Sequence, residues 1–185
     1  MNKIFLLSLM AFAAMTMSQC VKDDGSSADG GHDSIIDTTG SSDEYVDLGL
    51  RSMTLWKKTN EKNTADFSNG FYTYDEAVAA FGDDLPTQEQ FEELLHSCQW
   101  NWVEAGYYIV VGQNKNYIIM PADGFCDCTG GLCYPRTYGF YWSSTPAGSE
   151  KAWYLNFYSN GVYMYKDQRC FANSVRLVKK QLNIK

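Results

Sequence analysis

Basic residues are scarce in this chain. Its 185 residues include 15 lysines and arginines against 22 aspartates and glutamates, a formal net charge of −7. Nucleic-acid binding needs a basic surface that neutralises phosphates, so this balance argues against it. The acidity is local: seven acidic residues and one lysine lie between Val21 and Glu44, whereas fifteen acidic and thirteen basic residues follow from Tyr45 onward. We therefore expect an acidic segment attached to a nearly neutral folded part.

Histidine is scarcer still, with only His32 and His96. A Ser-His-Asp arrangement would have to use His96, which we expect on the surface of a helix. Neighbouring acids on a helix or loop usually form a solvated face, and this applies to Asp83, Asp84, Glu92 and Glu93. We therefore predict a protein that is not an enzyme and has no cofactor.

No apolar run approaches the roughly 20 residues that a membrane-spanning helix needs. The run Ile4–Ala14 follows Lys3 and precedes small and polar residues, which predicts a secretory signal peptide over residues 1–19. Met17-Ser-Gln-Cys20 resembles a bacterial lipobox, and Cys20-Val-Lys-Asp-Asp24 is similar to the export signal of Bacteroidetes surface lipoproteins. The resemblance implies a lipid on Cys20 and a protein of the outer membrane that faces the exterior, with the lipid as its only membrane contact.

Residues 20–44 are rich in Gly, Ser, Asp and Thr. Such a segment buries too little apolar surface to offset its chain entropy, so we predict a flexible tether. Residues 45–180 are long enough for one folded domain, which leaves a short tail over residues 181–185.

Short aromatic and β-branched runs, separated by turn residues, predict many strands in this domain. They are residues 45–56, 99–102, 106–111, 117–120, 139–145, 152–157, 162–165 and 174–178. Capping boxes at residues 73–76 and 87–90 predict the starts of two short helices. The second helix carries one apolar stripe, formed by Phe91, Leu94, Leu95 and Cys98. This order predicts an α+β fold of antiparallel β-sheets with both helices packed on one side.

Five motifs, in this order, resemble those of the Fibrobacter succinogenes major paralogous domain. They are Val46-Asp-Leu-Gly-Leu50 with Leu55-Trp56, Leu85–Leu95, Cys98-Gln-Trp100, Tyr141-Trp-Ser-Ser144 and Ser174-Val-Arg176. The resemblance covers residues 45–178 and implies a C-type-lectin-like fold. The chain departs from the family pattern at Arg51 and Met53, where Pro and Gly are usual, and in the loop from Cys126 to Cys133.

With Cys20 assigned to the lipid, five cysteines remain. Exported proteins usually form disulfides, and an odd number leaves one thiol free. Because Cys98 lies on the apolar stripe, we predict that it is the free one. The disulfide candidates are Cys126, Cys128, Cys133 and Cys170. Of three possible connectivities, we favour one bridge within the loop and a second from the loop to Cys170.

Other chemistries have weaker support. A zinc site formed by the three loop cysteines with Cys170 or His96 has unusual spacing, and an oxidising exterior disfavours thiolates. A catalytic thiol, as in the formylglycine-generating enzymes of lectin-like fold, needs neighbours that lower its pKa, and only the analogy of fold suggests one. The Glu-Pro-Asn, Gln-Pro-Asp and Trp-Asn-Asp triplets of calcium-dependent lectins are absent. We therefore predict no metal site.

The C-terminal strands are dense in aromatic residues with polar tips, which suit recognition. The predicted ligand-binding residues are Trp153, Tyr154, Tyr158, Tyr163, Tyr165 and Lys166. Alternate strand residues point to opposite faces. We expect Val162 and Met164 inside, and Tyr163 and Tyr165 partly exposed.

These observations lead to three hypotheses of function. The first is a surface-anchored binding or adhesion domain for a glycan or host protein at the cell surface. The second is an accessory or tip subunit of a cell-surface assembly, whose aromatic face a protein partner covers. The third is an enzyme of unrecognised class with a pocket near His96 and the acids.

Overall fold

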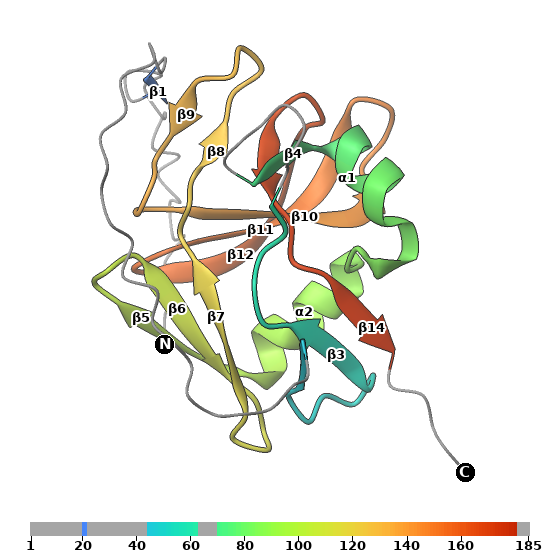
Figure 1. The fold of residues 1–185 in the computed structure, drawn as a ribbon, viewed down its shortest axis with the longest axis vertical. Helices are drawn as coiled ribbons and strands as arrows, with labels where there is room; N and C mark the ends of the chain where they lie inside the picture. Colours follow the sequence, from blue (N-terminus) through green and yellow to red (C-terminus); the bar gives the residue numbers. More distant parts are fainter. Residues whose placement is uncertain (1–19, 22–43, 63–69, 181–185) are drawn as a thin grey trace, which may run out of the picture.

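The computed structural model describes residues 20–21, 44–62 and 70–180 (Figure 1). The predicted signal peptide, most of the predicted tether and the short tail lie outside the described residues. The helices are α1 (Tyr74–Phe81) and α2 (Gln88–Ser97), joined by the 3-10 turn η1 (Gly82–Asp84). None of the helices in this described part is long and apolar enough to cross a membrane.

Within the described residues the strands form three sheets, and the fold is α+β as predicted. The largest sheet has eight strands in the order β1-β9-β8-β13-β10-β11-β12, with β4 paired to β13. Its strands are β1 (Cys20–Val21), β4 (Phe71–Thr73), β8 (Phe125–Cys126), β9 (Leu132–Cys133), β10 (Gly139–Pro146), β11 (Lys151–Tyr158), β12 (Gly161–Gln168) and β13 (Ala172–Ser174). Strand pairing is antiparallel except where β10 meets β13.

Two three-stranded sheets flank the large one. One has the order β14-β3-β2, with β2 (Tyr45–Asp47), β3 (Thr54–Lys57) and β14 (Val178–Lys180). The other has the order β5-β6-β7, with β5 (Gln99–Val103), β6 (Tyr107–Val111) and β7 (Tyr117–Pro121). In Figure 1 these sheets lie at the lower right and lower left.

Both predicted capping boxes are present. At α1 the Thr73 hydroxyl accepts from the Glu76 N–H, and the Glu76 carboxylate accepts from the Thr73 N–H at 2.8 Å. Thr87 and Gln90 form the same pair of bonds at the start of α2. Because these bonds satisfy N–H groups that have no partner inside the helix, the local sequence sets both starting points.

The two helices pack on opposite faces of the large sheet, so the prediction that they share one side is wrong. On one face the Tyr74 ring of α1 meets Trp142 of β10 edge-on, with centroids 5.7 Å apart. On the other, Phe91 of α2 belongs to the core cluster that contains Tyr141, the residue before Trp142. Successive strand residues point to opposite faces. The large sheet is therefore a middle layer with a hydrophobic cluster on each side.

The predicted strand over residues 174–178 is also wrong. Ser174 ends β13 in the large sheet, and Val178 begins β14 in a different sheet. The three residues between them cross from one sheet to the other. Apolar and β-branched residues favour a strand locally, but local preference cannot tell that the chain changes sheets at this point.

Arg176 lies in this crossing and is only 1% exposed. Its guanidinium donates to the carbonyl oxygens of Lys57, Lys58 and Ile119 and to the Asn60 side-chain oxygen, at 2.6 to 2.9 Å. These bonds use every N–H that an arginine carries. The buried charge is thereby compensated, and the crossing is fixed against β3 and β7.

Candidate binding surface

The β11–β12 hairpin separates its residues as predicted. Tyr163 and Tyr165 are 39% and 50% exposed on one face of β12. Val162 and Met164 are partly buried and pack against the core cluster of α2. The expected division between inside and outside along this strand is confirmed.

Five partly or fully exposed tyrosines, which we name the tyrosine surface, form a continuous row. They are Tyr134, Tyr138, Tyr158, Tyr163 and Tyr165. The centroids of successive rings in this order lie 5.2, 5.2, 6.0 and 5.9 Å apart. These spacings are those of interacting aromatic pairs. The row runs from the loop before β10 to β12, which ends the large sheet.

Gly161 makes room for part of this row. A Cβ at Gly161 would lie 2.3 Å from the Tyr163 hydroxyl oxygen and 2.5 Å from its Cζ. The Tyr163 ring therefore lies over Gly161 and stacks on Tyr158, which is opposite Gly161 in the hairpin. A hydrogen bond between the two tyrosines raises the pKa of Tyr158, because that bond favours the neutral hydroxyl.

Tyr154, another of the six predicted ligand-binding residues, is buried and does not belong to the exposed surface. Its side chain is 8% exposed. The ring lies between Phe140, at 5.8 Å, and Tyr165, at 6.4 Å, and meets Trp142 edge-on. Burial raises the pKa of its hydroxyl. Tyr154 thus packs beneath Tyr165 and supports its ring from the protein side.

Trp153 and Lys166, two of the six predicted ligand-binding residues, lie on the opposite face of the hairpin from the tyrosine surface. They are directly opposite each other in register, and the Lys166 Nζ is 5.7 Å from the Trp153 ring centroid. Because Tyr154 and Tyr165, one residue away in each strand, point to the tyrosine face, Trp153 and Lys166 must point away from it.

Sequence reasoning missed Tyr134 and Tyr138. The N–H of Tyr138 donates to the Tyr134 carbonyl at 3.2 Å, which closes a turn that brings both rings together. Tyr134 and Arg136 adopt positive φ angles of 53° and 61°. Residues other than glycine rarely take this conformation, and no motif in the sequence signals it.

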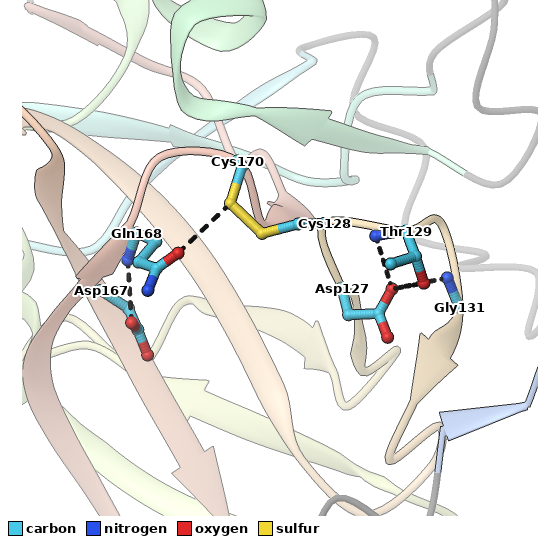
Figure 2. The surroundings of a disulfide bond; sticks show 7 residues. All are labelled: Asp127, Cys128, Thr129, Gly131, Asp167, Gln168 and Cys170. Carbon is cyan, nitrogen blue, oxygen red and sulfur yellow. Dashed lines mark hydrogen bonds between the residues drawn. A yellow bond between two sulfur atoms is a disulfide. The ribbon is translucent and has the colours of Figure 1, made fainter.

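A disulfide ties the loop after β8 to the turn after β12 (Figure 2). Cys128 and Cys170 are 42 residues apart in sequence, with Cα atoms at 5.1 Å. The predicted bridge from the loop to Cys170 is therefore confirmed. Asp127 orders the same loop, since its Oδ1 accepts from the Thr129 N–H, the Thr129 hydroxyl and the Gly131 N–H at 2.7 to 2.9 Å.

The predicted second bridge, within the loop, is wrong because Cys126 is a free thiol buried in β8. Cys98 is also free, as predicted. Burial raises the pKa of both thiols to about 11, so both stay protonated at neutral pH and are weak nucleophiles. Cys133, the remaining candidate, is buried in β9.

His96, the candidate for acid–base chemistry, lies on the surface of α2. His96 is exposed, with its Nδ1 2.6 Å from the Glu92 carbonyl oxygen in the preceding turn of α2. Over residues 44–62 and 70–180, no group of three or more His, Cys, Asp or Glu side chains is arranged to hold a metal ion.

One family model matches the chain. It is described as a domain of unknown function (DUF8237), and it matches residues 108–178. The matched segment contains the tyrosine surface, the Cys128–Cys170 disulfide and Arg176. Searches of the curated proteins and of the solved structures find no match to this chain.

Proposed function

We propose that this protein is a surface-anchored lipoprotein whose folded domain binds a glycan, without catalysis, through the tyrosine surface. The exposure of Tyr163 and Tyr165 at the end of a continuous row of rings carries the proposal. Contiguous exposed apolar groups on a folded domain usually mark an interaction site.

The chemistry of the surface suits a neutral, hydroxyl-rich ligand. Each ring offers a flat apolar face and a hydroxyl that both donates and accepts hydrogen bonds. A tyrosine side chain brings no formal charge to such a surface at neutral pH. A sugar presents the matching pair of features, apolar C–H faces and hydroxyl edges. The rings are also held in place by their neighbours, which limits the entropy lost on binding.

Location and family are part of the same proposal. The leader, the motif at Cys20 and the acidic tether support a lipoprotein displayed outside the outer membrane. The order of the five sequence motifs supports a C-type-lectin-like domain related to the major paralogous domain. Two of these motifs supply buried residues of the fold, Trp142 and Arg176.

Glycan arrays probed with the full chain test the proposal. A chain carrying both Tyr163→Ala and Tyr165→Ala should lose at least tenfold in affinity, since each removed ring is an exposed contact. The matched control is Tyr117→Ala, which removes a 46% exposed tyrosine from β7. If the double variant binds glycans as tightly as the wild-type chain does, the proposal is wrong.

A specific observation favours one other function, an accessory subunit of a surface assembly. β12 is an edge strand, and edge strands are natural sites for pairing with another chain. Purification of the full chain from outer membranes should then recover a different protein in fixed stoichiometry, and the Tyr163→Ala, Tyr165→Ala chain should lose it. Recovery of the chain without such a protein favours the glycan.

A further inference from the structure

We infer that β12 pairs with β12 of a second copy of this chain, which joins the two large sheets edge to edge. The inference goes beyond the proposed function, because it concerns the main chain of β12 and needs no ligand.

Among the sheet edges in the described part of the chain, β12 is the longest strand, with eight residues. Its register with β11 runs unbroken from Gly161 to Gln168. Two other edges carry side-chain caps: Asn114 and Asn116 donate to the Asp47 carbonyl of β2, and Arg176 donates to the Ile119 carbonyl of β7. Within the described residues, no side chain bonds to the main chain of residues 162–166.

The hairpin geometry identifies which groups are open. Tyr158 and Gly161 flank a two-residue turn, so they form a hydrogen-bonded pair across the hairpin. In an antiparallel ladder, the residues that bond to a given neighbour alternate along the strand. Val162, Met164 and Lys166 therefore direct their N–H and C=O groups away from β11. An extended polypeptide is the partner that matches such a row of alternating donors and acceptors.

The strand is complementary to itself. A two-fold axis perpendicular to the sheet keeps both tyrosine surfaces on the same face. Centred on Met164, it places each Tyr163 opposite Tyr165 of the second copy, in the non-hydrogen-bonded positions where side chains approach most closely. Cross-strand aromatic pairs of this kind are stabilising. On the other face, Val162 lies opposite Lys166 of the second copy and covers its aliphatic stem.

The charged residues of β12 disfavour a two-fold axis placed further along the strand than Met164. An axis centred on Lys166 would place two lysines directly opposite each other, and one centred on Asp167 would do the same with two aspartates. Like charges in directly opposed positions are destabilising. In the register centred on Met164 neither like-charge pair forms, and Tyr163 of each copy lies opposite Tyr165 of the other, the two most exposed residues of the tyrosine surface.

The predicted association is weak, because one strand pair buries less than the roughly 1,200 to 2,000 Å² of a stable interface. Confinement to a membrane surface would raise the effective concentration of the two copies. Pairing would also merge two tyrosine surfaces into one, so that two binding sites act together.

Cysteine cross-linking tests the register on full chains in intact bacteria. One chain carries Tyr163→Cys and a differently tagged chain carries Tyr165→Cys. Opposed residues at non-hydrogen-bonded positions have Cα atoms about 4.5 Å apart, within reach of a disulfide. A mild thiol oxidant should therefore yield a heterodimer that carries both tags. The control pairs Tyr165→Cys with Tyr117→Cys, an exposed tyrosine on β7. A yield no higher than that of the control overturns the inference.

A charge pair tests it independently of folding. Val162→Lys and Val162→Glu both place a charge where a partly buried valine stands, so their effects on folding are similar. In the Met164 register, the lysine would oppose Lys166 of the second copy, whereas the glutamate would attract it. Introduced into both cross-linking chains, Val162→Glu should give a yield severalfold above that of Val162→Lys. Equal yields, or the reverse order, overturn the register. Glycan binding is measured separately, so either proposal can fail alone.

Discussion

The positive charge of Arg176 is stabilised by neutral hydrogen-bond acceptors. One of them, Asn60, also bonds to the carboxylate of Asp123. The Asn60 amide oxygen accepts from the guanidinium, while its nitrogen donates to the Tyr141 hydroxyl at 3.0 Å and to Asp123 at 3.1 Å. Tyr141 in turn donates to the Pro121 carbonyl at 2.7 Å. Asn60 and Tyr141 thus each donate one hydrogen bond and accept another, as polar groups in a buried network must.

Replacement of Arg176 by lysine should break this network without removing the charge. Lysine has three N–H donors against five in arginine, so acceptors around Asn60 and Ile119 lose their partners. We expect the free energy of unfolding in urea to fall by about 3 kcal/mol. The exposed Arg51→Lys serves as the control and should change it by less than about 0.5 kcal/mol. A similar small loss for both variants would contradict the account of Arg176.

A second prediction concerns Tyr158 and Tyr163. The bond between their hydroxyls raises the pKa of Tyr158, so Tyr163→Phe, which removes one hydroxyl and keeps the ring, should lower it toward its ordinary value. Nuclear magnetic resonance of labelled tyrosine during an alkaline titration measures this directly. Tyr117→Phe should leave the Tyr158 titration unchanged. A Tyr158 pKa that stays raised in Tyr163→Phe would show that the two hydroxyls are not coupled.

Elements of this chain differ in how far sequence alone predicts them. The starts of α1 and α2 depend on bonds between residues three apart, and the sequence predicted both correctly. The alternation along β12 depends only on the period of a strand, and it too is confirmed. The positions of Trp153, Tyr154 and Lys166 depend on how β11 aligns with β12 and on what covers each face.

The errors share one cause, which is that contacts distant in sequence decide them. Nothing local tells that Ser174 and Val178 belong to different sheets, or that α1 and α2 lie on opposite faces. The error about Cys126 has the same cause, because the spacing of cysteines within a loop does not reveal which of them form a disulfide. The turn of Tyr134 and Tyr138 depends on positive φ angles that their residue types do not favour.

The Cys128–Cys170 bridge should stabilise the fold by restricting the unfolded chain. For a closed loop of this length, the chain-entropy model gives about 4 kcal/mol. We expect the free energy of unfolding to fall by this amount in Cys128→Ser, in Cys170→Ser and in the double variant, because each of them lacks the same disulfide. Urea unfolding under oxidising conditions measures all three. A double variant that loses about twice as much as either single one would show that the cysteines act separately.

The molecule as a whole should lose stability in alkali. Burial raises the pKa of Cys98 and Cys126 to about 11, and it raises the pKa of Tyr72, Tyr74, Tyr108, Tyr141 and Tyr154. Below the ordinary thiol pKa of about 8.5, both states are protonated and the stability is complete. As pH rises further, the unfolded chain releases its protons first, so the stability from these groups decreases until the folded pKa values are passed.

Urea unfolding at a series of pH values measures this loss. We expect a constant free energy of unfolding from about pH 7 to pH 8.5 and a steady decrease above it. A chain with Cys98→Ala and Cys126→Ala, compared with itself at neutral pH, should begin to lose stability about 1.5 pH units later, where tyrosines titrate. A constant free energy up to pH 11 would contradict the prediction.

The segment around Arg176, which connects the large sheet to β14, also affects when the chain can fold during synthesis. β14, at residues 178–180, pairs with β3, at residues 54–57, so the sheet nearest the start of the domain is completed by some of its last residues. A nascent chain that lacks residues 172–180 lacks β13, β14 and the arginine between them. Folding through such distant contacts is slow and waits for the loop to close. We propose that this chain is exported. The delay would keep the chain unfolded until translation has passed residue 180, and an unfolded chain is what a translocation pore can thread.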